Sequence, residues 1–155
     1  MTIGAIEGTI LDHALAAGWT PPGPPPRRGG RAAAVIGAGP AGLACAERLN
    51  AAGWTVSVHD RNREIGGLLA TGVPPFKLDK GLLARRRAWL EAAGVRFLLG
   101  SAVDGDLAAR LASDHDALFL GIGAQRPREV ALPGRDLSGV LNACLLYTSD
   151  AADDA

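Results

Sequence analysis

The sequence predicts an α/β fold built on a doubly wound parallel sheet, and three observations predict it. An apolar run at 32–36 is followed at once by the glycine-rich run 37–42 and then by a helical pattern. A second strand pattern at 55–59 ends on an acid, Asp60. Strand and helix patterns then alternate along the chain, which indicates parallel strands joined by right-handed crossovers.

Each element rests on its own pattern. The continuous apolar run at 32–36 is typical of a parallel strand buried on both faces. Behind it, Gly42, Ala46, Leu49 and Gly53 recur at steps of four, three and four, which is one face of a helix. The other expected elements are a helix near 3–14, an extended proline-rich segment at 21–26, a polar hinge at 27–30, strands at 55–59, 95–99 and 117–120, and helices at 79–93 and 106–112.

The glycine run has the spacing G-x-G-x-x-G, which is typical of dinucleotide binding in this strand–turn–helix context. Gly37 permits the tight turn, Gly39 lets the backbone approach a diphosphate, and Gly42 lets the helix pack close to the sheet. Pro40 fits the first helical turn, and the positive helix end binds the phosphates. Asp60 follows the last glycine by 18 residues, where a carboxylate can bind ribose hydroxyls.

Composition narrows the classes of function. Sixteen basic and sixteen acidic residues cancel, and the cluster at 85–87 indicates a solvated helix face, so no nucleic-acid partner is expected. Cys45 and Cys144 form no metal or disulfide framework. No apolar run is long enough for a membrane span and no signal peptide is recognised, so we expect a soluble, cytoplasmic chain. The three scattered histidines are expected at surface or strand-edge positions, and no catalytic residue or metal ligand is predicted.

A diglycine, Gly66-Gly67, favours FAD over NAD at this site. It follows the ribose-binding acid by six and seven residues, as in flavin enzymes that have two dinucleotide-binding domains. A carboxylate at Asp60 also disfavours NADP here, because it would repel a 2′-phosphate, although Arg61 could partly counter that charge.

Three segments, 35–46, 58–69 and 75–80, resemble the small (β) subunit of NADPH-dependent glutamate synthase, and the FAD domain of dihydropyrimidine dehydrogenase is related. The resemblance runs from about Ile3 to about Val140. It implies an incomplete, Rossmann-like FAD-binding domain of a two-dinucleotide-binding flavoprotein, with Asp60 in place of a usual glutamate. The cofactor-binding residues that the resemblance implies are Gly37, Ala38, Gly39, Pro40, Ala41, Gly42, Asp60, Gly67, Leu68, Lys77, Val103, Gly121 and Gly123.

The resemblance also implies an activity. Such a subunit takes hydride from NADPH onto FAD and passes electrons to iron–sulfur clusters, and a large subunit then makes glutamate from glutamine and 2-oxoglutarate. The cluster ligands and the NADPH domain would lie outside this chain, so the chain by itself is expected to be inactive. Three alternatives stay open: an NAD-binding dehydrogenase domain, a non-catalytic nucleotide-binding module, and a misassembled reading frame with no cellular product.

The expected organisation has three parts. Residues 1–30 form a short helix and a proline-rich linker, and residues 31–143 form the partial FAD-binding domain. Residues 144–155 continue no earlier pattern and resemble the conceptual translation of a sequencing adapter. The alternative for this tail is a genuine acidic, disordered terminus.

Overall fold

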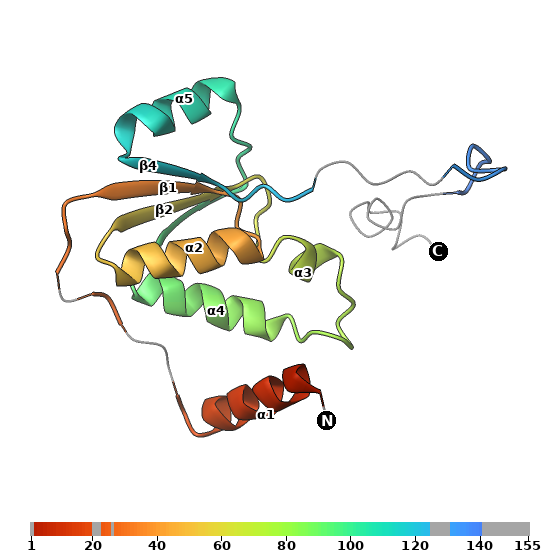
Figure 1. Ribbon diagram of the computed structural model, residues 1–155, viewed down its shortest axis with the longest axis horizontal. Helices are drawn as coiled ribbons and strands as arrows, with labels where there is room; N and C mark the ends of the chain where they lie inside the picture. The colour runs from red at the N-terminus through yellow and green to blue at the C-terminus, as the bar shows by residue number, and fades with distance from the viewer. Residues whose placement is uncertain (1, 20–22, 26, 125–130, 141–155) are drawn as a thin grey trace.

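A four-stranded parallel sheet organises the chain, with strand order β3-β2-β1-β4. The computed structural model describes residues 2–19, 23–25, 27–124 and 131–140. Its elements are α1 (Ile3–Ala16), β1 (Ala32–Ile36), α2 (Pro40–Ala51), β2 (Thr55–Asp60), α3 (Leu68–Thr71), α4 (Gly81–Ala92), β3 (Arg96–Leu99), α5 (Gly105–Asp114) and β4 (Ala117–Leu120). Helices α2 and α4 cover one face of the sheet and α5 covers the other (Figure 1). The predicted doubly wound α/β fold is confirmed.

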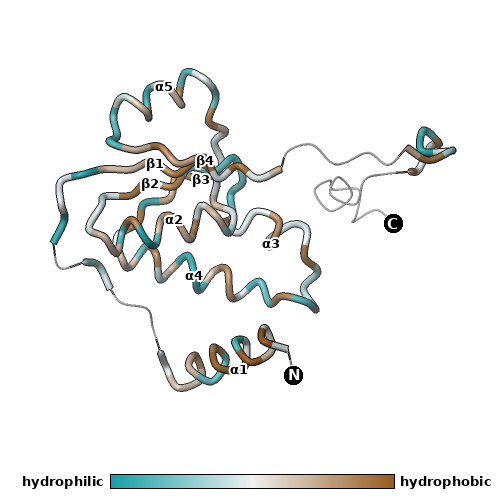
Figure 2. The backbone as a smooth tube through the Cα atoms, in the orientation of Figure 1, coloured by the Kyte–Doolittle hydropathy of each residue, from teal (hydrophilic) through white to brown (hydrophobic). Residues whose placement is uncertain are grey.

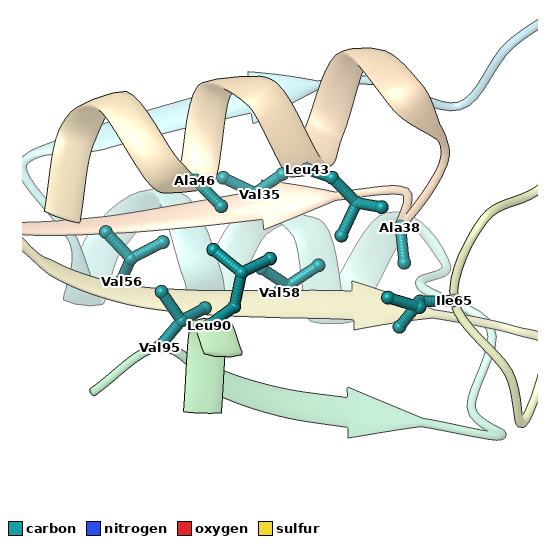
Figure 3. Packing of buried hydrophobic residues seen from close by; sticks show 9 residues of the cluster. All are labelled: Val35, Ala38, Leu43, Ala46, Val56, Val58, Ile65, Leu90 and Val95. Atoms are coloured by element: carbon teal, nitrogen blue, oxygen red, sulfur yellow. The ribbon is translucent and has the colours of Figure 1, made fainter. Parts of the chain in front are cut away.

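The larger core lies between the sheet and the pair α2 and α4. In register, Val35 of β1 lies beside Val58 of β2, and both side chains are fully buried. Figure 2 shows hydrophobic residues along the strands, and others on the outer helix α1. Burial of one such side chain contributes about 1.5–3 kcal/mol. The cluster, drawn in Figure 3, consists of Val35, Ala38, Leu43, Ala46, Val56, Val58, Ile65, Leu90 and Val95.

A smaller core lies on the α5 face. Ala34 and Ile36 alternate with Val35 along β1, so they point to the opposite side of the sheet and pack with Leu111 of α5. Asp104 caps α5, because its side chain accepts a hydrogen bond from the Leu107 N–H. This cap explains why α5 begins at Gly105, one residue before the predicted start.

The segment expected to be a polar hinge is instead bound to the domain. The Arg28 guanidinium donates to the Asn50 side-chain oxygen at 2.8 Å, to the Ala93 carbonyl at 3.3 Å and to the Trp54 carbonyl. These acceptors lie at the C-terminal ends of α2 and α4, where a cation is favoured by the helix dipoles. The guanidinium of Arg31 also lies 4.5 Å from the Trp54 ring centroid. The hinge prediction for 27–30 is therefore wrong.

Helix α1 is confirmed, but no residue in it is buried. The ring of Trp19, just after the helix, meets Trp89 of α4 edge to face with centroids 6.1 Å apart. The predicted proline-rich linker at 21–26 falls partly outside the described residues, and the predicted tail at 144–155 falls wholly outside them. The three-part organisation of the chain therefore stays a prediction. None of the helices in the described part of the chain is long and apolar enough to cross a bilayer.

Candidate dinucleotide-binding site

The glycine run forms a tight loop between β1 and α2 whose shape depends on missing side chains. The Gly37 N–H donates to the His59 carbonyl at 2.7 Å, and Gly37 has φ of +106°. A Cβ on Gly37 would lie 2.3 Å from the Gly121 carbonyl oxygen, and one on Gly42 would lie 1.8 Å from the Gly37 carbonyl oxygen. Both contacts are too close for any side chain, so glycine is required at these two positions.

Gly121 brings the end of β4 against the same loop. Its N–H donates to the Ile36 carbonyl at 2.7 Å, and a Cβ on it would lie 3.2 Å from the Gly42 nitrogen. Backbone from β1, α2 and β4 therefore meets at the carboxyl edge of the sheet. Ligands bind at this edge in open α/β sheets, near the point where strand order reverses.

Gly39 differs from its two neighbours because nothing fills the space beside it. It precedes α2 with extended backbone, and a Cβ built on it would meet no atom within 4 Å. Among the described residues, the N–H groups of Gly39, Ala41 and Gly42 have no hydrogen-bond acceptor. Pro40 stands at the first helical position, where it has no N–H to satisfy. Open space above unpaired donors at a helix start fits an anionic diphosphate.

The diglycine loop lies directly against the first loop. The Gly66 N–H donates to the Ala38 carbonyl at 2.8 Å. Gly67 has φ of +54°, and a Cβ on it would lie 3.2 Å from the Gly39 Cα. Leu68, the next residue, is 57% exposed at the start of α3. The two glycine-rich loops therefore form one continuous backbone surface.

Asp60 ends β2 beside this surface, and its carboxylate binds backbone. One oxygen accepts from the Ala38 N–H at 2.7 Å, and the other accepts from the Asn62 N–H at 2.8 Å. Each carboxylate oxygen can accept more than one hydrogen bond, so capacity for a ribose hydroxyl remains. The acid fixes the loop in addition to any ligand contact, a role that its position in the sequence does not reveal.

Not every residue implied by the resemblance gathers at the loops. Val103 packs against the smaller core on the α5 face, although its loop touches the site where the Ser101 N–H donates to the Asp60 carbonyl at 3.2 Å. Lys77 is exposed, and its side chain makes no hydrogen bond or ion pair within the described residues. Gly123 has φ of +70° with open space around it.

Two contacts that join helices have no local sequence signal. The Lys80 ammonium donates to the carbonyls of Leu69 and Val73, and so ties α3 to the start of α4. Buried Asn50 donates to the Ala93 carbonyl at 3.0 Å and so joins the ends of α2 and α4. Both contacts join residues that are separated along the sequence by 11 or 43 positions, and hydrophobic periodicity does not report such contacts.

The histidines are less scattered than the sequence suggested. The Ser57 hydroxyl lies 3.2 Å from the His59 Nε2 and 3.3 Å from the His115 Nε2. His59 is only 7% exposed, on an inner strand, so its expected surface or strand-edge position is wrong. Burial lowers the pKa of His59, and the nearby charges of His115 and Arg96 lower it further. Across the described residues, no three His, Cys, Asp or Glu side chains gather as a metal site.

The known proteins that this chain is similar to agree with this description of the site. Residues 35–88 match the family model described as NAD(P)-binding Rossmann-like domain. The chain is 42% identical to the glutamate synthase [NADPH] small chain of Halomonas elongata, over 99% of this chain and 35% of that protein. The chain is a homologue of part of the glutamate synthase small chain. The resemblance stated from the sequence is thereby confirmed.

Other relatives agree with this homology. The putative oxidoreductase AegA of Escherichia coli is 48% identical over 92% of this chain and 22% of its own length. The solved structure of Mycobacterium tuberculosis FprA in complex with NADPH superposes with a TM-score of 0.67 at 25% identity, covering 76% of this chain and 28% of that one. The chain thus spans about a third or less of the small chain and of these other relatives.

Proposed function

We propose that this glutamate synthase small-chain homologue binds FAD, with the diphosphate on the loop at 37–42 and the remainder of the cofactor passing the loop at 66–67. The observation that carries the proposal is the contact of the two loops, where Gly67 approaches Gly39 so closely that a Cβ would lie 3.2 Å from the Gly39 Cα. Two adjoining backbone surfaces without side chains suit a cofactor longer than one phosphate group. The open donors of Gly39, Ala41 and Gly42 would bind its charge.

The residues at the site would bind and orient the cofactor rather than react. When bound, FAD would supply the hydride-accepting chemistry, and the protein would position it. Asp60 would hold the loop through Ala38 and accept from a ribose hydroxyl. Gly121 and Gly123 would border the cofactor from the end of β4, and Leu68 from α3. Lys77 and Val103 are part of the proposal on the resemblance alone.

The activity of a longer protein is proposed from its relatives. Relatives named glutamate synthase [NADPH] small chain support an NADPH-dependent oxidoreductase that passes electrons to iron–sulfur clusters and a large subunit. Glutamate synthesis from glutamine and 2-oxoglutarate in the cytoplasm belongs to the same proposal. The 155 residues hold one G-x-G-x-x-G run, so we propose that this chain alone binds one dinucleotide and does not oxidise NADPH.

Calorimetric titration of the 155-residue chain with FAD, and separately with NAD⁺ and NADP⁺, tests the proposal. We expect FAD to bind and the two nicotinamide dinucleotides to bind at least tenfold more weakly, which corresponds to about 1.4 kcal/mol. Tight NAD⁺ binding without FAD binding would contradict the proposal and favour an NAD-binding dehydrogenase domain. ADP serves as a control, because it contains the adenosine and diphosphate but lacks the part expected to pass Gly67.

A further inference from the structure

The cluster of Ser57, His59 and His115 has a defined proton arrangement. The His115 Nδ1 lies 3.0 Å from the Leu111 carbonyl, which can only accept, so Nδ1 carries the proton in neutral His115. Its Nε2 is then an acceptor for the Ser57 hydroxyl. The Ser57 oxygen in turn accepts from the His59 Nε2–H. With both imidazoles neutral, every hydrogen bond of the chain has one donor and one acceptor.

This cluster is joined to the glycine loop through the backbone of β2. The carbonyl of His59 accepts from the Gly37 N–H at 2.7 Å. The next residue, Asp60, accepts from the Ala38 N–H at 2.7 Å. Two consecutive residues of β2 therefore hold two consecutive N–H groups of the loop, and a displacement of the His59 side chain would move the loop's two anchors.

Charges around His59 offer no compensation for an added proton. Strand β3 contributes Arg96, which pairs in register with Ser57, and α5 contributes His115 at its C-terminal end. Strand β1 contributes only Ala34 and Ile36 on this face. Three nearby carboxylates accept hydrogen bonds from the backbone: Asp60 from Ala38 and Asn62, Asp104 from Leu107 at the start of α5, and Asp116 from Ala32. The side chains of Asp106 and Asp114 are exposed to solvent, as is that of Arg110.

We propose that Ser57, His59 and His115 form a proton-sensitive latch that positions the glycine loop. In the neutral state the latch holds the carboxyl end of β2, and with it Gly37 and Ala38, in the geometry described above. Because the His59 Nε2 already carries a proton, a second proton goes to Nδ1 and introduces a cation into a site that is 7% exposed and already flanked by Arg96. The loop then loosens, and affinity for a dinucleotide falls in acid. That last consequence rests on the proposed function, whereas the loosening of the loop does not.

The folded chain favours the neutral form of His59, and this sets the direction in which the latch depends on pH. The pKa of His59 is lowered from its ordinary value by burial and by the charges of His115 and Arg96. The latch is therefore fully effective above about pH 6.5, the ordinary histidine pKa. The latch weakens as the pH falls from about 6.5 toward the lowered pKa of His59. Over this range the equilibrium constant for holding the loop falls by up to about tenfold per pH unit, because one proton is involved.

Amide hydrogen exchange on the ligand-free chain tests the latch. Protection factors for Gly37 and Ala38 are measured between pH 8 and pH 5 in the wild type, in His59→Gln, in His115→Gln and in the control His13→Gln, whose imidazole lies on α1. We expect protection in the wild type and the control to fall by about tenfold or more in acid. We expect His59→Gln to show no such fall. Equal losses in the wild type and in His59→Gln, or constant protection in the wild type, would overturn the proposal.

Two further readouts keep the test decisive. If His59→Gln does not fold, the imidazole signals of the wild type decide, because the latch requires His59 to stay neutral below the ordinary histidine pKa of about 6.5. Titration of His59 at or above that ordinary value would contradict it. FAD titration at pH 8 then tests the proposed function separately. A chain that binds no FAD but loses loop protection in acid would contradict the function and support the latch.

Discussion

The Asp60 carboxylate accepts a hydrogen bond from the Ala38 N–H at 2.7 Å, so the acid that ends β2 directly fixes the glycine loop that follows β1. These residues are 22 positions apart in the sequence. The same carboxylate accepts from the Asn62 N–H at 2.8 Å and so shapes the turn that leaves β2. Asp60 therefore contributes to the structure of the site before any ligand is present.

Replacing Asp60 is predicted to destabilise the ligand-free chain. Asp60→Ala leaves the N–H groups of Ala38 and Asn62 without their acceptor, which costs about 1–3 kcal/mol. Asp60→Asn keeps one side-chain oxygen as acceptor and is expected to lose less. Urea unfolding of the two variants beside Glu7→Gln, an exposed acid on α1, measures the difference. Equal stability of Asp60→Ala and the wild type would show that the carboxylate serves only a ligand.

The fit of α2 against the loop predicts that Gly42 tolerates no side chain. A Cβ would lie 1.8 Å from the Gly37 carbonyl oxygen and 3.2 Å from the Val35 Cγ1, so the helix must move away from the sheet. We expect Gly42→Ala to lose about 1–3 kcal/mol or more of unfolding free energy, the range for overpacked cores. Thermal unfolding followed by circular dichroism measures it. A melting temperature equal to that of the wild type would contradict the described packing.

Arg28 is predicted to couple the N-terminal segment to the domain. Its guanidinium donates to Asn50, Trp54 and Ala93 at the ends of α2 and α4. Because Arg28 is partly exposed to solvent, we expect Arg28→Ala to cost only about 1 kcal/mol, with Arg28→Lys intermediate. Limited proteolysis in the proline-rich segment is expected to become faster in both variants. Unchanged cleavage rates would show that the segment is not held by this side chain.

Much of the fold could be predicted from the sequence because its signals are local. The runs at 32–36 and 117–120 are apolar throughout and became β1 and β4 with those bounds. The spacing of the glycines predicted the position of the loop, since Gly37 and Gly42 stand where the structure leaves no room for a Cβ. The role of Arg28 and the burial of His59 could not be predicted. Both depend on which elements pack together in the fold, and the hydrophobic periodicity of the sequence does not reveal such contacts.

The contacts of the Asp60 carboxylate and of the histidine cluster could not be predicted from the sequence either. The sequence position of Asp60 predicts an acid near a ribose, but the hydrogen bond to Ala38 requires the three-dimensional path of both loops. Ser57, His59 and His115 meet because β2 and the end of α5 are neighbours in the fold. Ligand contacts at Lys77 and Val103 remain predictions, because they depend on a cofactor's position.

The binding of FAD by Gly39→Ala tests the central claim most directly. Gly39 has φ of −74°, and an added methyl group would meet no protein atom within 4 Å, so the variant should fold like the wild type. The methyl group would occupy the space proposed for the diphosphate. We predict unchanged thermal stability and FAD affinity at least tenfold weaker, about 1.4 kcal/mol, whereas the exposed control Gly8→Ala binds like the wild type. Wild-type FAD affinity in Gly39→Ala would contradict the proposal that this loop holds the cofactor.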